Sequence, residues 1–109
     1  MATRAVIIVP GLSVKLYKHW DGYPSGTLPW LEKFNRKFTK ERGVDPNYKF
    51  AQLIRSSVRM AEEFRLDSSH HTGWGVMPIN ENCGEEYIYT LQDDGTVIYK
   101  DVYDIRRED

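Results

Sequence analysis

The spacing of apolar residues changes twice along this chain, and that change restricts its fold more than any other feature. Residues 4–9 form a continuous β-branched run, and residues 13–18 alternate apolar and polar side chains, as strands do. Residues 27–42 and 46–65 instead carry apolar residues three and four positions apart, which predicts two helices. Strand-like patterns return in three later segments, residues 73–79, 86–92 and 96–103. The predicted order is β-β-α-α-β-β-β.

That order predicts an α+β fold: a mainly antiparallel sheet of about five strands, with two helices packed on one face. The 109 residues suit a single domain over 1–109, with residues 104–109 expected to form a frayed, charged tail. Regularly alternating strand–helix units are missing, which argues against a Rossmann-type fold. No cofactor is therefore expected.

Turn-forming residues mark where these segments begin and end. Pro10-Gly11 predicts a hairpin that places Arg4 beside Lys18 or His19, within one register step. Later, Thr27 is the predicted N-cap of the first helix. The expected end of that helix follows at residue 43, a glycine, and Asp45-Pro46 is typical of the start of the second helix.

Asp94-Gly95 predicts a two-residue turn that closes the final hairpin. The register of such a turn assigns one sheet face to Tyr87, Tyr89, Leu91, Ile98 and Val102. The opposite face then carries Ile88, Thr90, Val97, Tyr99 and Tyr103. Both faces are substantially apolar, and the chain has a basic first half and an acidic end. These patterns predict a homodimer.

The overall composition excludes several classes of protein. Fifteen Lys and Arg against 16 Asp and Glu leave a net charge of −1, which provides no general attraction to nucleic acid. The basic residues of positions 33–42 are interpreted as a solvated helix face. No apolar run approaches the about 20 residues that span a bilayer, and no signal-peptide pattern occurs. We therefore expect a cytoplasmic protein without a membrane or nucleic-acid partner.

One segment combines chemistry-bearing residues unusually closely: His19-Trp20-Asp21-Gly22-Tyr23-Pro24, after the predicted first hairpin. Together with the opening Thr3-Arg4 and the preceding Tyr17-Lys18, this block resembles a family of small, uncharacterised bacteriophage and prophage proteins. The resemblance covers the first quarter of the chain. It implies a phage-like origin and, for a phage-encoded protein, a location in the host cytoplasm.

The residues of this block suit a nucleotide-like ligand. A guanidinium can hold a phosphate or carboxylate through two hydrogen bonds, and aromatic rings can stack on a base. Glycine lets a ligand approach the backbone closely. The predicted ligand-binding residues are Arg4, Lys18, His19, Trp20, Asp21, Gly22 and Tyr23.

Three functions are compatible with these residues. The first is a non-enzymatic binding protein that captures a nucleotide-derived molecule, such as a host immune signal. The second is a small phosphodiester hydrolase in which His19 acts as general acid or base and Asp21 orients it. The third is an inhibitor that binds a host defence protein. The sequence favours the first, because it shows no obvious nucleophile.

Two other features, a pair of histidines and the single cysteine, are not expected to form a site. His70 and His71 are adjacent, and no established metal-ligand spacing accompanies them, so no metal site is expected. Cys83 is the single cysteine and has acidic neighbours, which disfavour a reactive thiolate.

Overall fold

A computed structural model describes residues 3–63 and 73–103. It contains seven elements in the predicted order, and the α+β class is confirmed. The elements are β1 (Ala5–Ile8), β2 (Val14–Lys18), α1 (Pro24–Arg42), α2 (Pro46–Glu63), β3 (Trp74–Pro78), β4 (Tyr87–Leu91) and β5 (Val97–Asp101). None of the helices in this described part is long and apolar enough to cross a membrane.

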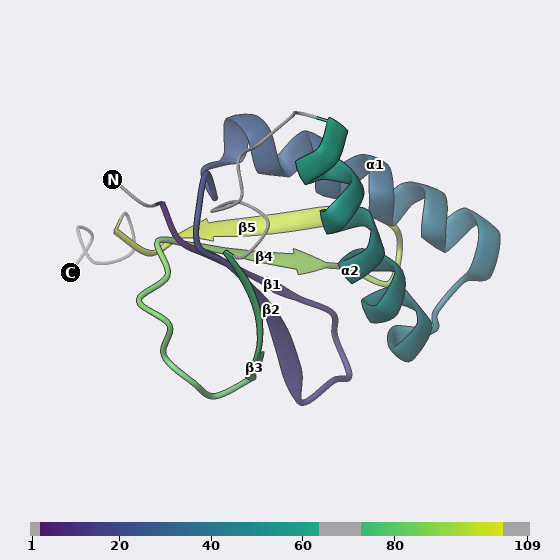
Figure 1. The fold of residues 1–109 in the computed structure, drawn as a ribbon. Helices are drawn as coiled ribbons and strands as arrows, with labels where there is room; N and C mark the ends of the chain where they lie inside the picture. The colour runs from purple at the N-terminus through teal and green to yellow at the C-terminus, as the bar shows by residue number, and fades with distance from the viewer. Residues whose placement is uncertain (1–2, 64–72, 104–109) are drawn as a thin grey trace.

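The five strands form one sheet in the order β3-β2-β1-β4-β5. Three neighbouring pairs are antiparallel, whereas β1 and β4 run parallel, so the sheet is mixed. The parallel pair arises because the chain leaves β3 at one edge, passes β2 and β1, and enters the sheet again beyond β1 (Figure 1).

The hydrophobic core lies between the sheet and the helices. Figure 1 shows α1 and α2 on the same side of the sheet. On β1, the buried residues Ala5 and Ile7 point to this side, because side chains alternate along a strand. Leu31 of α1 and Leu53 of α2 belong to the same buried cluster and are fully enclosed. The apolar face of each helix therefore contributes to one core.

The first hairpin has the predicted register. Ala5 pairs with Lys18 and Val6 with Tyr17, so the next position along places Arg4 opposite His19. This arrangement follows from the turn after β1, where Gly11 has a φ of 95°, a value that glycine adopts without strain.

The second hairpin differs from its prediction by one residue. Leu91 pairs with Val97 and Tyr89 with Tyr99, so the connection has three residues, 93–95, rather than two. Gly95 adopts a φ of 96° at the last of these positions, which is typical of a three-residue hairpin loop. Because side chains alternate, the shift exchanges the faces of β5. Val97 and Tyr99, not Ile98, share a face with Tyr89.

Helix α1 begins earlier than predicted. Its N-cap is Tyr23, Pro24 occupies the first turn, and Thr27 lies inside the helix. The Thr27 hydroxyl is buried and donates a hydrogen bond to the backbone oxygen of Asp21, at 2.9 Å. Thr27 therefore ties the helix to the preceding loop instead of capping it. Gly43 is the C-cap, as predicted.

Candidate functional site

The sheet face turned away from the helices brings together Arg4, Tyr17 and His19. Val6 pairs with Tyr17, and Arg4 lies opposite His19, so the side chains of these four positions share one face. The connection between β3 and β4 passes over this face. It is held there in part by the Lys15 ammonium, which donates to the backbone oxygen of Glu81.

A surface depression of about 380 Å³ opens beside this group, at the end of β2 and along β3. We call it the aromatic depression and define it by its lining residues Tyr17, His19, Trp20, Gly73, Trp74, Gly75 and Met77. Two of the predicted ligand-binding residues, His19 and Trp20, line it directly. A cavity of this size accommodates a small molecule.

The orientation of His19 is set by two neighbouring aromatic side chains. Its Nδ1 lies 2.6 Å from the hydroxyl of Tyr17, within hydrogen-bonding distance. Its ring meets that of Trp20 edge to face, with centroids 4.6 Å apart and an interplanar angle of 90°. Burial raises the pKa of Tyr17, which favours the protonated phenol as partner of the imidazole. The imidazole and the indole therefore lie as one packed unit.

Arg4 lies near this depression but is not part of its lining. Its side chain is exposed, and its Nη1 is so close to Gly84 that a Cβ on this glycine would lie 2.8 Å from it. The positive charge of Arg4 also favours the ionised form of Tyr17, although burial of the phenol outweighs this effect on the pKa. The guanidinium is thus positioned on the same face as the imidazole.

Lys18 was predicted to act with His19, but the structure does not bring them together. Successive residues of a strand point to opposite faces, and Lys18 points toward the helices. Its Nζ lies 4.4 Å from the ring centroid of Trp74. Burial lowers the pKa of Lys18 to about 8, and the nearby charge of Asp21 opposes this shift.

Asp21, Gly22 and Tyr23 form the loop between β2 and α1. The backbone N–H of Gly22 donates to Thr3 O at 2.8 Å, and the backbone oxygen of Gly22 accepts a hydrogen bond from the Tyr89 hydroxyl at 2.6 Å. A Cβ at Gly22 would lie 2.7 Å from that of Ala5. Gly22 is therefore needed for close packing of the chain against itself, and its contact with a ligand stays a prediction.

The other two residues of this loop are exposed and contact each other. The Tyr23 hydroxyl donates to Asp21 Oδ1 at 3.2 Å. Asp21 has a φ of 53°, in the left-handed region that favours glycine but that aspartate tolerates better than most residues. The pair stabilises the exit from β2.

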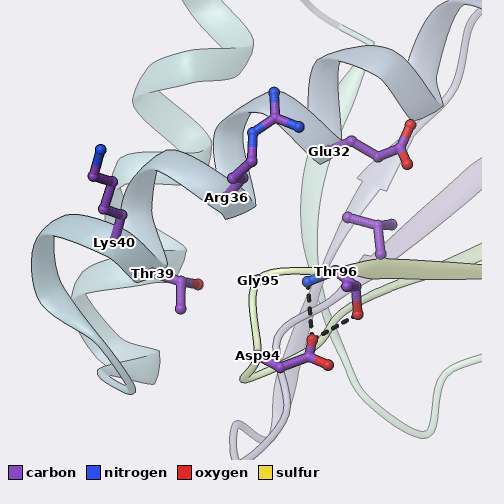
Figure 2. A pocket seen from close by; sticks show the side chains of 8 residues that line it. Glu32, Arg36, Thr39, Lys40, Asp94, Gly95 and Thr96 are labelled. Atoms are coloured by element: carbon purple, nitrogen blue, oxygen red, sulfur yellow. Dashed lines mark hydrogen bonds between the residues drawn. The ribbon is translucent and has the colours of Figure 1, made fainter.

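A second depression, of about 440 Å³, lies between α1 and the turn of the β4–β5 hairpin (Figure 2). Its charged lining residues are Glu32, Arg36, Lys40 and Asp94. The sequence interpretation missed it, because Arg36 and Lys40 were assigned to a solvated helix face. No sequence signal points to it, since it forms only when the hairpin turn packs against the helix.

The contacts of this second depression are largely internal. Asp94 accepts hydrogen bonds from the backbone and the hydroxyl of Thr96, at 2.9 and 2.6 Å, and these lower the pKa of Asp94 (Figure 2). Opposite them, the Thr39 hydroxyl is buried and makes no hydrogen bond within the described part of the chain. With two cations and two anions, this depression favours no particular charge of ligand.

Of the remaining candidates of the sequence, the structure describes Cys83 but not the histidine pair. Within residues 3–63 and 73–103, no group of three His, Cys, Asp or Glu side chains could hold a metal ion. His70 and His71 lie outside the described residues. Burial raises the pKa of the Cys83 thiol, and Glu81 and Glu85 add to this effect, so the thiol form is favoured.

Comparison with known proteins adds no family to this picture. The chain matches no protein-family model, no curated protein and no solved structure.

Proposed function

We propose that the protein binds a small anionic molecule with a flat ring, of the nucleotide class, at the aromatic depression. The observation that carries this proposal is the packed His19–Trp20 pair, which lines a depression of about 380 Å³. A side chain held in place by its neighbours loses little conformational freedom when it contacts a ligand. The pair is therefore well suited to bind a planar group.

Each part of such a ligand has a matching group on this face. The indole of Trp20 offers a surface for a base, and the imidazole of His19 offers polar contacts. The exposed guanidinium of Arg4 lies on the same face and suits a phosphate. Asp21 and Tyr23 lie at the exit from β2, where they contribute to the loop rather than to this lining.

The resemblance to bacteriophage proteins extends the proposal to a biological role. A phage protein that binds a nucleotide-derived host signal lowers its free concentration without turnover.

The proposal is tested by screening cyclic and linear nucleotides, with thermal unfolding and isothermal titration calorimetry as readouts. A ligand that binds the folded state raises its melting temperature. Replacing the indole in Trp20→Ala should then weaken binding at least about fivefold, since stacking contributes about 1–3 kcal/mol per base. Tyr48→Ala serves as the matched control, because Tyr48 is an exposed aromatic residue on α2.

Two outcomes would contradict the proposal. One is the absence of any melting shift with any nucleotide, at concentrations up to about millimolar. The other is a ligand whose affinity falls equally in Trp20→Ala and in Tyr48→Ala. Analysis of the nucleotide after incubation also decides between capture and hydrolysis, because a captured ligand is recovered unchanged.

The proposal includes a homodimer, for which the exposed apolar residues of the C-terminal hairpin provide the support. Ile98 and Tyr99 of β5 are 48% and 45% exposed, and Tyr103 follows at 46%. Neighbouring exposed apolar residues at one edge of a sheet are typical of an interaction surface.

A further inference from the structure

The two edge strands of the sheet differ in their ability to pair with another strand. β3 contains Gly75 and ends in Pro78, and proline lacks the N–H that a β-ladder requires. β5 has the sequence Val-Ile-Tyr-Lys-Asp, without glycine or proline. Its first three residues are among the best strand formers. Only β5 therefore has the composition of a strand that adds another strand at its edge.

The hydrogen bonds of the hairpin determine which residues of β5 point outward. Gln92 N–H donates to Thr96 O, and Val102 N–H donates to Glu86 O, both at 2.9 Å. In an antiparallel pair, residues whose backbone N–H and C=O point toward the partner strand alternate with residues whose backbone groups point away from it. The backbone groups of Val97 and Tyr99 consequently point away from β4, toward the open edge of the sheet.

We propose that two copies of the chain pair antiparallel through β5, about a two-fold axis at Ile98, to form one continuous sheet. This inference rests on the proposed homodimer and specifies its edge and register. Ile98 then lies opposite the partner's Ile98, and Val97 lies opposite the partner's Tyr99. Each apolar side chain of the strand meets another apolar side chain across the interface.

Neighbouring registers are less favourable. A two-fold axis at Tyr99 places Ile98 opposite the partner's Lys100. An axis at Lys100 places two ammonium groups directly opposite each other, which is destabilising. An axis at Val97 shortens the paired segment. The register centred on Ile98 avoids each of these problems.

Charge complementarity supports the same register. It places Lys100 opposite the partner's Thr96. The Thr96 hydroxyl and N–H both bond to the carboxylate of Asp94, so this carboxylate lies beside position 96. Lys100 is exposed, as is Asp94, and the ammonium of one copy therefore reaches the carboxylate of the other. The two-fold axis produces this ion pair twice.

The register is tested by disulfide cross-linking in a Cys83→Ser background. Opposed residues of a non-hydrogen-bonded pair have Cα atoms about 4.5 Å apart, which is within disulfide range. Ile98→Cys should therefore give a cross-linked dimer on a non-reducing gel after mild oxidation. Val76→Cys is the matched control, because Val76 is 53% exposed on the opposite edge strand and should remain monomeric.

Sedimentation velocity of the unmodified chain, from about 10 µM to about 1 mM, tests self-association independently. The inference is supported by a concentration-dependent dimer whose dissociation constant rises about two- to tenfold in Lys100→Asp. A dimer that fails to cross-link through Ile98→Cys overturns the register while the homodimer stands. A chain that stays monomeric throughout, or equal cross-linking of both cysteine variants, overturns the pairing through β5.

Discussion

The two ends of the sheet are built for different contacts. At the β2–β3 end, the strands lie beside packed aromatic rings and a depression of about 380 Å³, and the edge strand contains a glycine and a proline. At the β4–β5 end, the edge strand begins with three β-branched or aromatic residues, of which Ile98 and Tyr99 are about half exposed. One end suits a small ligand, and the other suits another strand.

Different interactions also hold the two ends to the helices. At the β2–β3 end, Trp30 of α1 contacts Trp74 of β3 edge to face, with ring centroids 5.8 Å apart. The loop from β2 to α1 is held at Gly22, which bonds to Thr3 O and to the Tyr89 hydroxyl of β4. At the β4–β5 end, a buried amide, that of Asn35, binds the hairpin on both sides of its turn. Each end is therefore held by its own contacts, so a substitution can weaken one end without the other.

The largest effect is expected for Gly22→Ala, in the loop that follows β2. Its Cβ would lie 2.7 Å from that of Ala5 and 2.8 Å from Thr3 O, so the backbone must shift. We expect the free energy of unfolding to fall by about 3 kcal/mol. Denaturant unfolding measures this value. The control is Gly26→Ala, where no atom lies within 4 Å, and an equal loss there would contradict the steric explanation.

A smaller effect is expected for Asn35→Ala, at the β4–β5 end, where the dimer is proposed. Asn35 Nδ2 donates to the oxygens of Gln92 and Thr96, at 2.9 and 2.8 Å. Loss of the amide should lower the free energy of unfolding by about 2 kcal/mol. It should also weaken the β5 dimer, which sedimentation velocity detects. The exposed Asn47 provides the control, since Asn47→Ala should change stability by less than about 0.5 kcal/mol. Unchanged stability of Asn35→Ala would show that the hairpin needs no such anchor.

The smallest effect concerns the pH dependence of the free energy of unfolding, to which Lys18 of β2 contributes. Its pKa is about 8 in the folded protein and near 10.5 when unfolded, so between these values the unfolded chain holds more protons. Stability should therefore rise with pH across this window, by up to about 1.8 kcal/mol from pH 7.5 to pH 9.5. Well below pH 8, Lys18 is protonated in both states, so it adds no pH dependence to the stability.

Thermal unfolding as a function of pH tests this expectation. In Lys18→Met the rise should shrink to the part contributed by Lys49, whose pKa is also lowered by burial, whereas the exposed Lys33→Met should keep the full rise. An undiminished rise in Lys18→Met would assign the titration to another group.

The two hairpins show why one register could be predicted and the other could not. In the first, Pro10-Gly11 leaves few ways to join two patterned strands, and Ala5 pairs with Lys18 as expected. In the second, Asp94-Gly95 is compatible with either a two-residue or a three-residue loop. Asn35 bonds to Gln92 and Thr96, the residues that flank the three-residue loop. The observed register thus comes with a contact from Asn35 of α1, which is far from the hairpin in the sequence.

The candidate site was predicted only in part, for a similar reason. Proximity in sequence grouped Lys18 with His19, but strand alternation separates them onto opposite faces of the sheet. Gly22 was assigned to a ligand, whereas Ala5 and Thr3 occupy the space beside it. Tyr17 and Met77 line the aromatic depression but were not among the predicted ligand-binding residues, because their role depends on the pairing of β2 with β3.

The sequence by itself determined the order and type of the elements, because hydrophobic periodicity and turn residues act over a few neighbouring positions. Only the tertiary structure decided that β4 would lie parallel to β1, which side chains share a face, and which depressions form. These properties depend on contacts between residues far apart in the chain, such as Tyr89 with Gly22. Such contacts form when the sheet and helices bury their apolar faces together, and local patterns do not encode them.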